Sequence, residues 1–280
     1  MNDLAIFYDH LTEAALQEGC ELFGMLRRAR DTGYDSVNIM LSTLDSGEEA
    51  MKLLGRSGLG VNSVCCFTSF GERPAEEEKK EALRVLSVVE GTGCCKLMSI
   101  PGFLKTEEEK RRGSAAYLEK RERMAEILCF LTKEAAKRGV TVLMEDFDGD
   151  QAPFCTGEEL LWFLDRVEGL KCAFDTGNFM YADQEAAALL PAFLPKVADV
   201  HLKDRGLEEN GSEVKVSIGG RKLYAVPVGS GVIPIREMME TLLRAGYTGA
   251  FAAEHYGSSR QAEDMVLSAR FIKGVCGAFR

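Results

Sequence analysis

The sequence lacks a long apolar run and lacks the short motifs typical of exported or zinc-knuckle proteins. No stretch approaches the roughly 18 apolar residues of a membrane span, and no basic N-terminal segment precedes an apolar one. The nine cysteines are an odd number without a Cys-x-x-Cys pair, which argues against a disulfide framework. We therefore expect a cytoplasmic protein with reduced thiols and no membrane association.

Basic residues are outnumbered by acidic ones, and histidines are scarce. The chain has 34 lysines and arginines against 44 aspartates and glutamates, a formal net charge of −10, which opposes nonspecific binding to nucleic acid or anionic lipid. It has three histidines, and none lies between His10 and His201. We expect no nucleic-acid partner.

What the chain does have is a regular alternation of strand-like and helix-like segments. Its 280 residues are 46% hydrophobic and 28% charged, as in an α/β protein with a full core. Apolar runs of strand length occur at residues 4–8, 36–40, 60–67, 94–100, 140–147, 170–175, 197–203 and 250–254. Helical periodicity separates most of them, as where Met124, Ile127, Leu128 and Leu131 share one face. Eight β/α units in about 250 residues predict a single-domain (β/α)8 TIM barrel spanning residues 1–280.

Three local signals refine this prediction. Thr156 and Glu159 have capping-box spacing, and Pro234 stands where a first helical residue would be. The acidic run at residues 76–81 is typical of solvated surface. The connection from Asp204 to Gly231 is long and rich in glycine, which favours a lid or binding loop at the active-site edge.

Four of the apolar runs end at or near a residue that can bind metal or transfer a proton. These residues are Glu145, Asp175, His201 and Glu254. Because active-site residues of a β/α barrel lie at the carboxyl ends of its strands, the four side chains are expected to converge on one divalent cation. Their oxygen-rich donor set suits Mn²⁺ best, with Mg²⁺, Co²⁺ or Zn²⁺ as alternatives.

Such a site suggests a chemistry. A cation that holds the two adjacent oxygens of a hydroxy-carbonyl compound acidifies the neighbouring C–H and stabilises an enediolate, and Glu145 and Glu254 could then transfer the proton. Lys203 shares a strand face with His201 and is either a substrate-binding cation or the partner of a carboxylate; we favour substrate binding.

The ordered set of motifs resembles the xylose isomerase-like TIM-barrel family, the sugar phosphate isomerase/epimerase group. The motifs are VLMEDF around Glu145, FDTGNF at residues 174–179, VHLKD at 200–204, VPVGSGVIP at 226–234 and FAAEH at 251–255. The resemblance is clear from about residue 140 onward. It implies a (β/α)8 barrel with one divalent metal on the four residues above and, in epimerase members, Glu145 and Glu254 as the acid/base pair.

The resemblance also bears on the substrate. Members with the HLKD form include inosose dehydratase-like and inosose isomerase-like proteins, in which the lysine lies near the substrate. This chain has Asn178 where many relatives carry histidine, and Asn38 where a glutamate is frequent. Those positions shape the substrate pocket, so Asn178 and Asn38 are predicted to bind substrate.

The sequence therefore predicts a metal-dependent isomerase or epimerase acting on a sugar, sugar phosphate or keto-inositol, with a homo-oligomer compatible with the sequence. One alternative is an inosose dehydratase-like lyase that eliminates water from a keto-polyol. A second is a noncatalytic sugar-binding protein. A DNA-cleaving relative with a histidine-rich zinc cluster is disfavoured, because the early strands contain no histidine.

Overall fold

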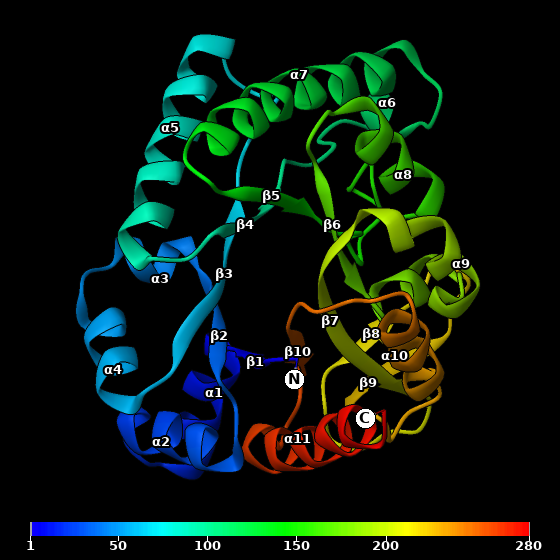
Figure 1. Cartoon of the computed structure of the whole chain (residues 1–280). Helices are drawn as coiled ribbons and strands as arrows, with labels where there is room; N and C mark the ends of the chain where they lie inside the picture. Colours follow the sequence, from blue (N-terminus) through cyan, green and yellow to red (C-terminus); the bar gives the residue numbers. More distant parts are fainter. Residues whose placement is uncertain (1, 280) are drawn as a thin grey trace.

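The eight apolar runs form parallel strands that pair in chain order and close into a barrel (Figure 1). The computed structural model describes residues 2–279. The barrel strands are β1 (Leu4–Phe7), β2 (Ser36–Met40), β3 (Gly60–Phe67), β4 (Lys96–Ile100), β5 (Thr141–Met144), β6 (Lys171–Asp175), β7 (Val197–Gly206) and β10 (Phe251–Glu254). β10 pairs with both β1 and β7 and so closes the ring. The predicted (β/α)8 barrel is confirmed.

Helices surround the ring of strands, as Figure 1 shows. The first half of the chain contributes α1 (Tyr8–Glu18), α2 (Leu22–Thr32), α3 (Leu41–Asp45), α4 (Glu49–Ser57), α5 (Ala75–Thr92) and α6 (Glu107–Lys110). The second half contributes α7 (Ala115–Lys137), α8 (Gly157–Arg166), α9 (Ala186–Phe193), α10 (Ile235–Arg244), α11 (Gln261–Ala278) and the 3-10 turns η1 (Asn178–Ala182) and η2 (Leu194–Lys196). Because helices cover the outside of the sheet, the barrel strands are buried on both faces.

Packing between strand and helix decides which side chains point into the barrel. On β6, the ring of Phe174 lies 5.5 Å from the rings of both Phe179 and Phe193, which belong to η1 and α9. Phe174 is therefore on the outer face. Since side chains alternate along a strand, Ala173 and Asp175 lie on the inner face.

The glycine-rich connection after Lys203 contains structure that the sequence analysis did not predict. β7 continues to Gly206, and β8 (Val214–Val216) and β9 (Lys222–Val226) form an antiparallel hairpin beside it. The Asp183 carboxylate fixes the far end of this hairpin by accepting hydrogen bonds from Ser217 Oγ and Arg221 Nε at 2.8 and 2.9 Å. The connection from Asp204 to Gly231 therefore contains an ordered hairpin that is hydrogen-bonded to Asp183, and it is not an irregular loop throughout.

Two helix starts and one acidic run can be compared with the sequence predictions. Thr156 caps α8 and forms the predicted capping box with Glu159. Pro234 is the residue before α10, so its expected place as the first helical residue was wrong by one position. In the acidic run, Glu78 is buried, and its carboxylate accepts the backbone N–H groups of residues 71, 72 and 73. Glu78 therefore holds the loop of residues 71–73 in place, and the prediction of solvated surface is wrong for this residue.

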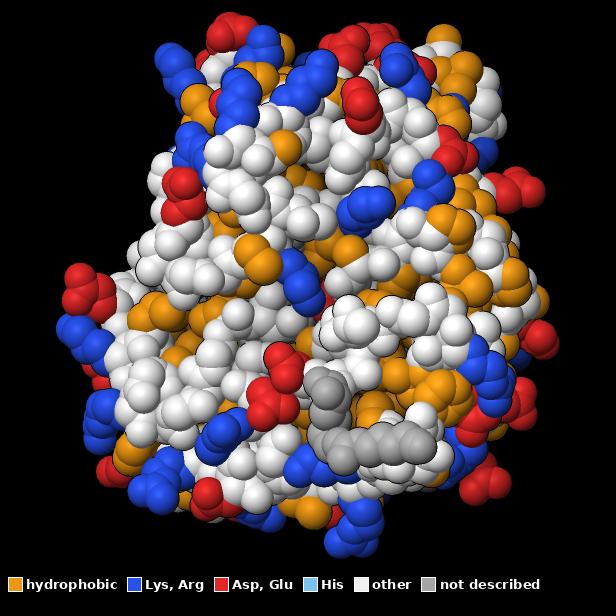
Figure 2. Space-filling view, viewed as in Figure 1, with side chains coloured by type: hydrophobic (Ala, Val, Ile, Leu, Met, Phe, Trp, Pro, Cys, Tyr) orange, Lys and Arg blue, Asp and Glu red, His pale blue; other side chains and the backbone are white. Residues whose placement is uncertain are grey.

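The surface carries charges of both signs. Figure 2 shows lysine and arginine side chains interspersed with aspartate and glutamate around the outline of the molecule. Within residues 2–279, no helix is long and apolar enough to cross a membrane. Within residues 2–279, no cysteine forms a disulfide.

Candidate active site

Four strand ends bring the predicted metal-binding side chains together. Glu145 directly follows β5, Asp175 and Glu254 end β6 and β10, and His201 lies within β7. One potential ligand atom from each of the four residues lies within 4.8 Å of the others, and all four side chains are buried. Adjacent strands keep them in register, because Asp175 and Ala252 each pair with His201.

The close approach of these groups fits a cation. His201 Nδ1 lies 2.7 Å from Glu145 Oε2 and 3.6 Å from Glu254 Oε2. Within the part of the chain that the structure describes, Asp175 Oδ2 and Glu254 Oε2 are buried oxygens that accept no hydrogen bond. Buried carboxylate oxygens without a donor are costly unless a cation or proton compensates them. Three carboxylates and one imidazole form a donor set suited to a divalent metal.

The turn after β6 aims Asp175. Its Oδ1 accepts the backbone N–H groups of Gly177 and Asn178, each at 2.7 Å, which leaves Oδ2 directed toward the cluster. Gly177 is required here because a Cβ would lie 2.8 Å from the carbonyl oxygen of Lys203. The glycine of the FDTGNF motif therefore lets the turn approach β7 closely.

A buried polar network orients His201 from the side opposite the carboxylates. The Asn38 amide lies 3.1 Å from His201 Nε2, and Asn62 Nδ2 donates to Asn38 Oδ1 at 2.7 Å. Asp199 Oδ2 accepts from Asn62 at 3.0 Å, while Lys96 Nζ lies 3.1 Å from Asp199 Oδ1. Because these contacts occupy Nε2, Nδ1 is the nitrogen that faces the metal site.

Lys203 joins the cluster through ion pairs. Its ammonium group contacts the Glu254 carboxylate, lies 3.5 Å from Asp175 Oδ2 and donates to Asn178 Oδ1 at 2.5 Å. Asn178 in turn donates to the backbone oxygen of Asp146 at 2.9 Å. Burial disfavours the ammonium form, but the charges of Asp175 and Glu254 outweigh it and raise the pKa of Lys203.

The neighbouring charges also shift the pKa values of two predicted ligands. Burial raises the pKa of Glu254 to about 8, with Asp175 and Glu145 acting in the same direction and Lys203 opposing them. Burial disfavours a charged imidazole, yet the charge and hydrogen bond of Glu145 raise the pKa of His201 to about 9. A cation bound at these atoms would compete with protons, so its affinity would fall as the pH is lowered.

A cavity of about 320 Å³ opens over this cluster. Glu145, Lys203 and Glu254 reach it, so both glutamates and the lysine can contact a bound molecule. The rest of its wall is largely apolar and aromatic, formed by Phe7, Met40, Phe67, Met98, Phe147 and Tyr256, with Asp9, Asp148 and Asn178 as further polar groups. A few converging polar groups in an apolar cavity are typical of a small-molecule site.

Comparison with known proteins agrees with this arrangement. The family model for the xylose isomerase-like TIM barrel matches residues 26–275. The chain belongs to the xylose isomerase-like TIM-barrel family. An inosose dehydratase of Bacillus anthracis is 26% identical over 214 residues, covering 72% of this chain and 71% of the relative. The resemblance identified from the sequence motifs is confirmed.

Solved members of this fold superpose on nearly the whole chain. A xylose isomerase-like TIM-barrel protein from Mycobacterium smegmatis in complex with magnesium has a TM-score of 0.69 at 19% identity, covering 92% of this chain and 88% of that one. D-allulose 3-epimerase from Methylomonas sp. has a TM-score of 0.72 at 16% identity and covers 98% of each chain. The family points to a sugar-modifying enzyme.

The structure separates the predicted substrate-binding residues. Lys203 and Asn178 line the cavity, whereas Asn38 is not among its lining residues and instead contacts His201. His255, next to Glu254, faces away from the cluster, and its Nε2 lies 2.7 Å from Ser268 Oγ. Substrate binding by Lys203, Asn178 and Asn38 stays a prediction, but the place of Asn38 fits a residue that positions the imidazole.

Several residues of the site were missed by sequence reasoning. Asn62, Lys96 and Asp199 form the network behind His201, and Tyr256 closes the cavity. Asp199 carried a usable signal, because it lies two residues before His201 on the same strand face. Asn62 and Lys96 carried none, since an isolated polar residue in a strand resembles an outward-facing one.

Proposed function

We propose that this protein is a divalent-metal-dependent isomerase or epimerase of a hydroxy-ketone or hydroxy-aldehyde of the sugar or polyol class. The observation that carries the proposal is the pair Glu145 and Glu254: both reach the cavity, and both belong to the buried four-residue cluster that could hold a cation. The apolar rim formed by Phe7, Phe67 and Phe147 would shield the reacting carbon from water.

The cation would be held by Glu145, Asp175, His201 and Glu254. When bound, it would polarise the substrate carbonyl and so acidify the adjacent C–H bond. Mn²⁺ is our first choice from the donor set, and the magnesium complex of the Mycobacterium smegmatis relative supports Mg²⁺ as an alternative.

The two glutamates provide the proton transfer. A positioned carboxylate contributes a rate factor of about 10²–10⁴ when it accepts a proton from carbon. If Glu145 and Glu254 face opposite sides of the bound carbon, the proton leaves one face and returns to the other, which inverts the centre. Lys203 lies between the Glu254 and Asn178 side chains and can donate a hydrogen bond to a substrate oxygen.

Hydrogen exchange tests this reaction directly. The manganese-loaded protein is incubated in deuterated water with ketoses and keto-inositols, and recovered sugar is examined for deuterium at the carbon next to the carbonyl. We expect incorporation by the natural protein and a loss of at least 10²-fold in Glu145→Gln and Glu254→Gln. Full exchange in both variants would show that the glutamates do not transfer the proton.

A dehydratase is the second candidate function. The observation favouring it is the 26% identity to an inosose dehydratase over most of the chain. A lyase would begin with the same proton abstraction but expel a β-hydroxyl in place of reprotonating carbon. In the exchange experiment, a product lighter by one water identifies the dehydratase, and an isomer carrying deuterium identifies the isomerase or epimerase. Binding without exchange or elimination would indicate a noncatalytic sugar-binding protein.

A further inference from the structure

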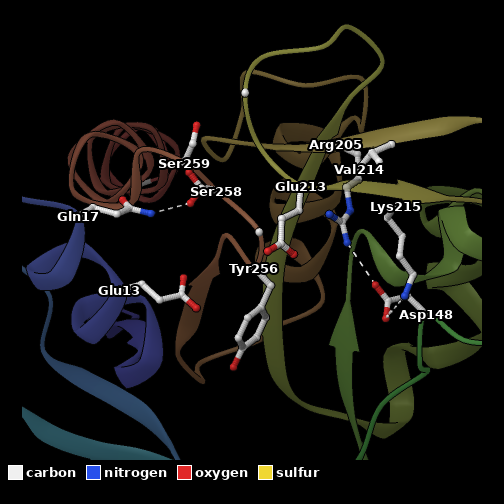
Figure 3. Close-up of a pocket in the computed structure, with 12 residues that line it drawn as sticks. Glu13, Gln17, Asp148, Arg205, Glu213, Val214, Lys215, Tyr256, Ser258 and Ser259 are labelled. Carbon is white, nitrogen blue, oxygen red and sulfur yellow. Dashed lines mark hydrogen bonds and ion pairs between the residues drawn. The ribbon is translucent and has the colours of Figure 1, made fainter.

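A second, larger cavity adjoins the one over the metal-binding cluster. It has a volume of about 670 Å³ and shares Asp148 and Tyr256 with the inner cavity. Figure 3 shows its walls: Glu13 and Gln17 from α1 on one side, and the extended end of β7 with the β8–β9 hairpin on the other. We call it the outer cavity.

The outer cavity has a fixed wall. The backbone N–H of Glu213 donates to the oxygen of Gly257 at 2.8 Å and so ties the hairpin to the loop after β10. Gly257 has φ +84°, and a Cβ at this position would lie 3.0 Å from Glu213 Cβ. Gln17 Nε2 donates to the Ser258 oxygen at 2.9 Å, which ties the same loop to α1. The walls are therefore held in place without a ligand.

The charges of the outer cavity oppose a phosphate group. Arg205 and Lys215 contact the same carboxylate, Asp148, at 3.3 and 3.2 Å, so one of the two positive charges is already neutralised. Glu13 on the α1 side and Glu213 on the hairpin side add two carboxylates. Three acidic groups against two basic ones leave no net attraction for an anion.

Several of these groups retain unused hydrogen-bonding capacity. Among the residues that the structure describes, the Glu213 carboxylate makes no hydrogen bond or ion pair. Lys215 Nζ makes one ion pair, to Asp148, and is partly exposed, so it has further N–H donors to offer. The free Glu213 acceptor and the Lys215 donors match hydroxyl groups, which both donate and accept.

We propose that the outer cavity binds a second, uncharged polyhydroxylated ring, so that the substrate is a keto-glycoside whose reacting ring occupies the inner cavity. This inference rests on the proposed function and names its substrate class. The inner cavity, at about 320 Å³, is near the lower end of the roughly 300–1,000 Å³ of ligand pockets, and the outer cavity adds room for a second unit. Tyr256 stands where the two rings join.

Binding tests the outer cavity independently of catalysis. Calorimetry on the manganese-loaded protein compares methyl glucoside, glucose 6-phosphate and the disaccharides cellobiose, maltose, lactose and sucrose. We expect at least one disaccharide to bind about 10-fold more tightly than methyl glucoside, a gain of about 1.4 kcal/mol, and glucose 6-phosphate to show no such gain. Tighter binding of the phosphate, or no gain for any disaccharide, overturns the proposal.

Two variants locate the second ring. Ser259 lines the outer cavity, and Ser259→Trp places a bulky side chain there. Ser259→Ala is its matched control, because the proposal gives the Ser259 hydroxyl no contact with the second ring. Glu213→Ala removes the free carboxylate. We expect Ser259→Trp and Glu213→Ala to lose the disaccharide advantage and Ser259→Ala to keep it. A disaccharide advantage that persists in both Ser259→Trp and Glu213→Ala places the second ring elsewhere and refutes the assignment.

The proposed function can fail separately. Suppose that no keto-sugar exchanges its α-hydrogen but disaccharides bind with the expected preference. The sugar-binding role of the outer cavity then stands, and the proposed isomerase or epimerase activity is wrong. If one-ring keto-sugars exchange and keto-disaccharides exchange no faster, the reaction stands and the outer cavity is not a sugar subsite.

Discussion

At the scale of single residues, the metal-binding cluster makes the clearest prediction. Asp175 and His201 each supply one of the four converging ligand atoms, so removing either leaves an incomplete site. We expect about one divalent ion per chain in protein purified without chelator, and less than half of that in Asp175→Asn and His201→Ala, by elemental analysis. Unchanged metal content in both variants would mean that the cluster is not a metal site.

Asn38 gives a prediction that distinguishes positioning from substrate contact. Its amide meets His201 Nε2 and holds the ring so that Nδ1 faces Glu145. Loss of such a support typically lowers metal affinity about 10–100-fold. We expect Asn38→Leu to weaken Mn²⁺ binding by this factor in a chelator competition assay. Native metal affinity with a raised KM would instead show that Asn38 binds the substrate, as the sequence analysis predicts.

Lys203 is expected to behave in the opposite way. Its ammonium group contacts carboxylates of the cluster and reaches the cavity, but it cannot bind a cation. Lys203→Met should lower kcat/KM for α-hydrogen exchange at least 10-fold while metal content stays near one ion per chain. The measurement pairs exchange kinetics with elemental analysis. A variant that loses its metal would show that the lysine orients Asp175 or Glu254.

The sequence indicated the four converging residues but not what holds them. Strand-end position alone was enough for the quartet, because parallel strands of a barrel deliver their carboxyl ends to one rim. Apart from Asp199, the support of His201 was not foreseeable, because Asn38, Asn62 and Lys96 come from three different strands and meet only in the closed barrel. Such contacts depend on register and not on local pattern.

At the scale of elements, the strands were predictable and the hairpin was not. All eight barrel strands occur where apolar runs were found, because burial on both faces gives each strand a continuous hydrophobic signal. β8 and β9 lack that signal: Val214 and Val216 are about half exposed, and the strands exist through pairing with each other and with the end of β7. Their stability comes from partners outside the segment.

Asp204 fastens the loop that joins this hairpin to α10. Its carboxylate accepts the backbone N–H groups of Gly229 and Gly231 at 2.9 and 2.8 Å, and also those of Arg205 and Ile233. Gly231 must be glycine, because a Cβ would lie 2.4 Å from the Arg205 carbonyl oxygen. The acidic residue of VHLKD and the glycines of VPVGSGVIP thus form one structural unit.

Removing this carboxylate should be costly. Hydrogen bonds to a charged group contribute about 1.5–3 kcal/mol each, and water can replace part of what Asp204→Ala loses, so we expect a loss of about 3 kcal/mol in the free energy of unfolding. Asp183→Ala is the control, since Asp183 accepts a similar set of bonds on the hairpin but is exposed, and it should lose less. Urea unfolding measures both. Equal effects would contradict a special role for the buried clamp.

At the scale of the whole molecule, a buried histidine joins the first and last β/α units and makes the fold sensitive to acid. His10, on α1, accepts the backbone N–H of His255 at its Nε2, at 2.8 Å, and its ring lies 4.5 Å from that of Tyr256. Burial, reinforced by His255 and Lys203, lowers the pKa of His10 well below its usual 6.5. Folded His10 therefore stays neutral where the unfolded chain is protonated.

This difference fixes the sign of a pH effect. Below about pH 6.5 the unfolded chain binds one proton more than the folded chain at this site, so the free energy of unfolding falls by up to about 1.4 kcal/mol per pH unit. In His10→Gln, the side-chain oxygen can still accept the His255 N–H but does not titrate. We expect urea unfolding between about pH 7 and pH 5 to show a shallower loss of stability in the variant, by up to one proton. Parallel pH profiles for the two proteins would mean that His10 is already charged in the folded state, which its donor at Nε2 and its burial argue against.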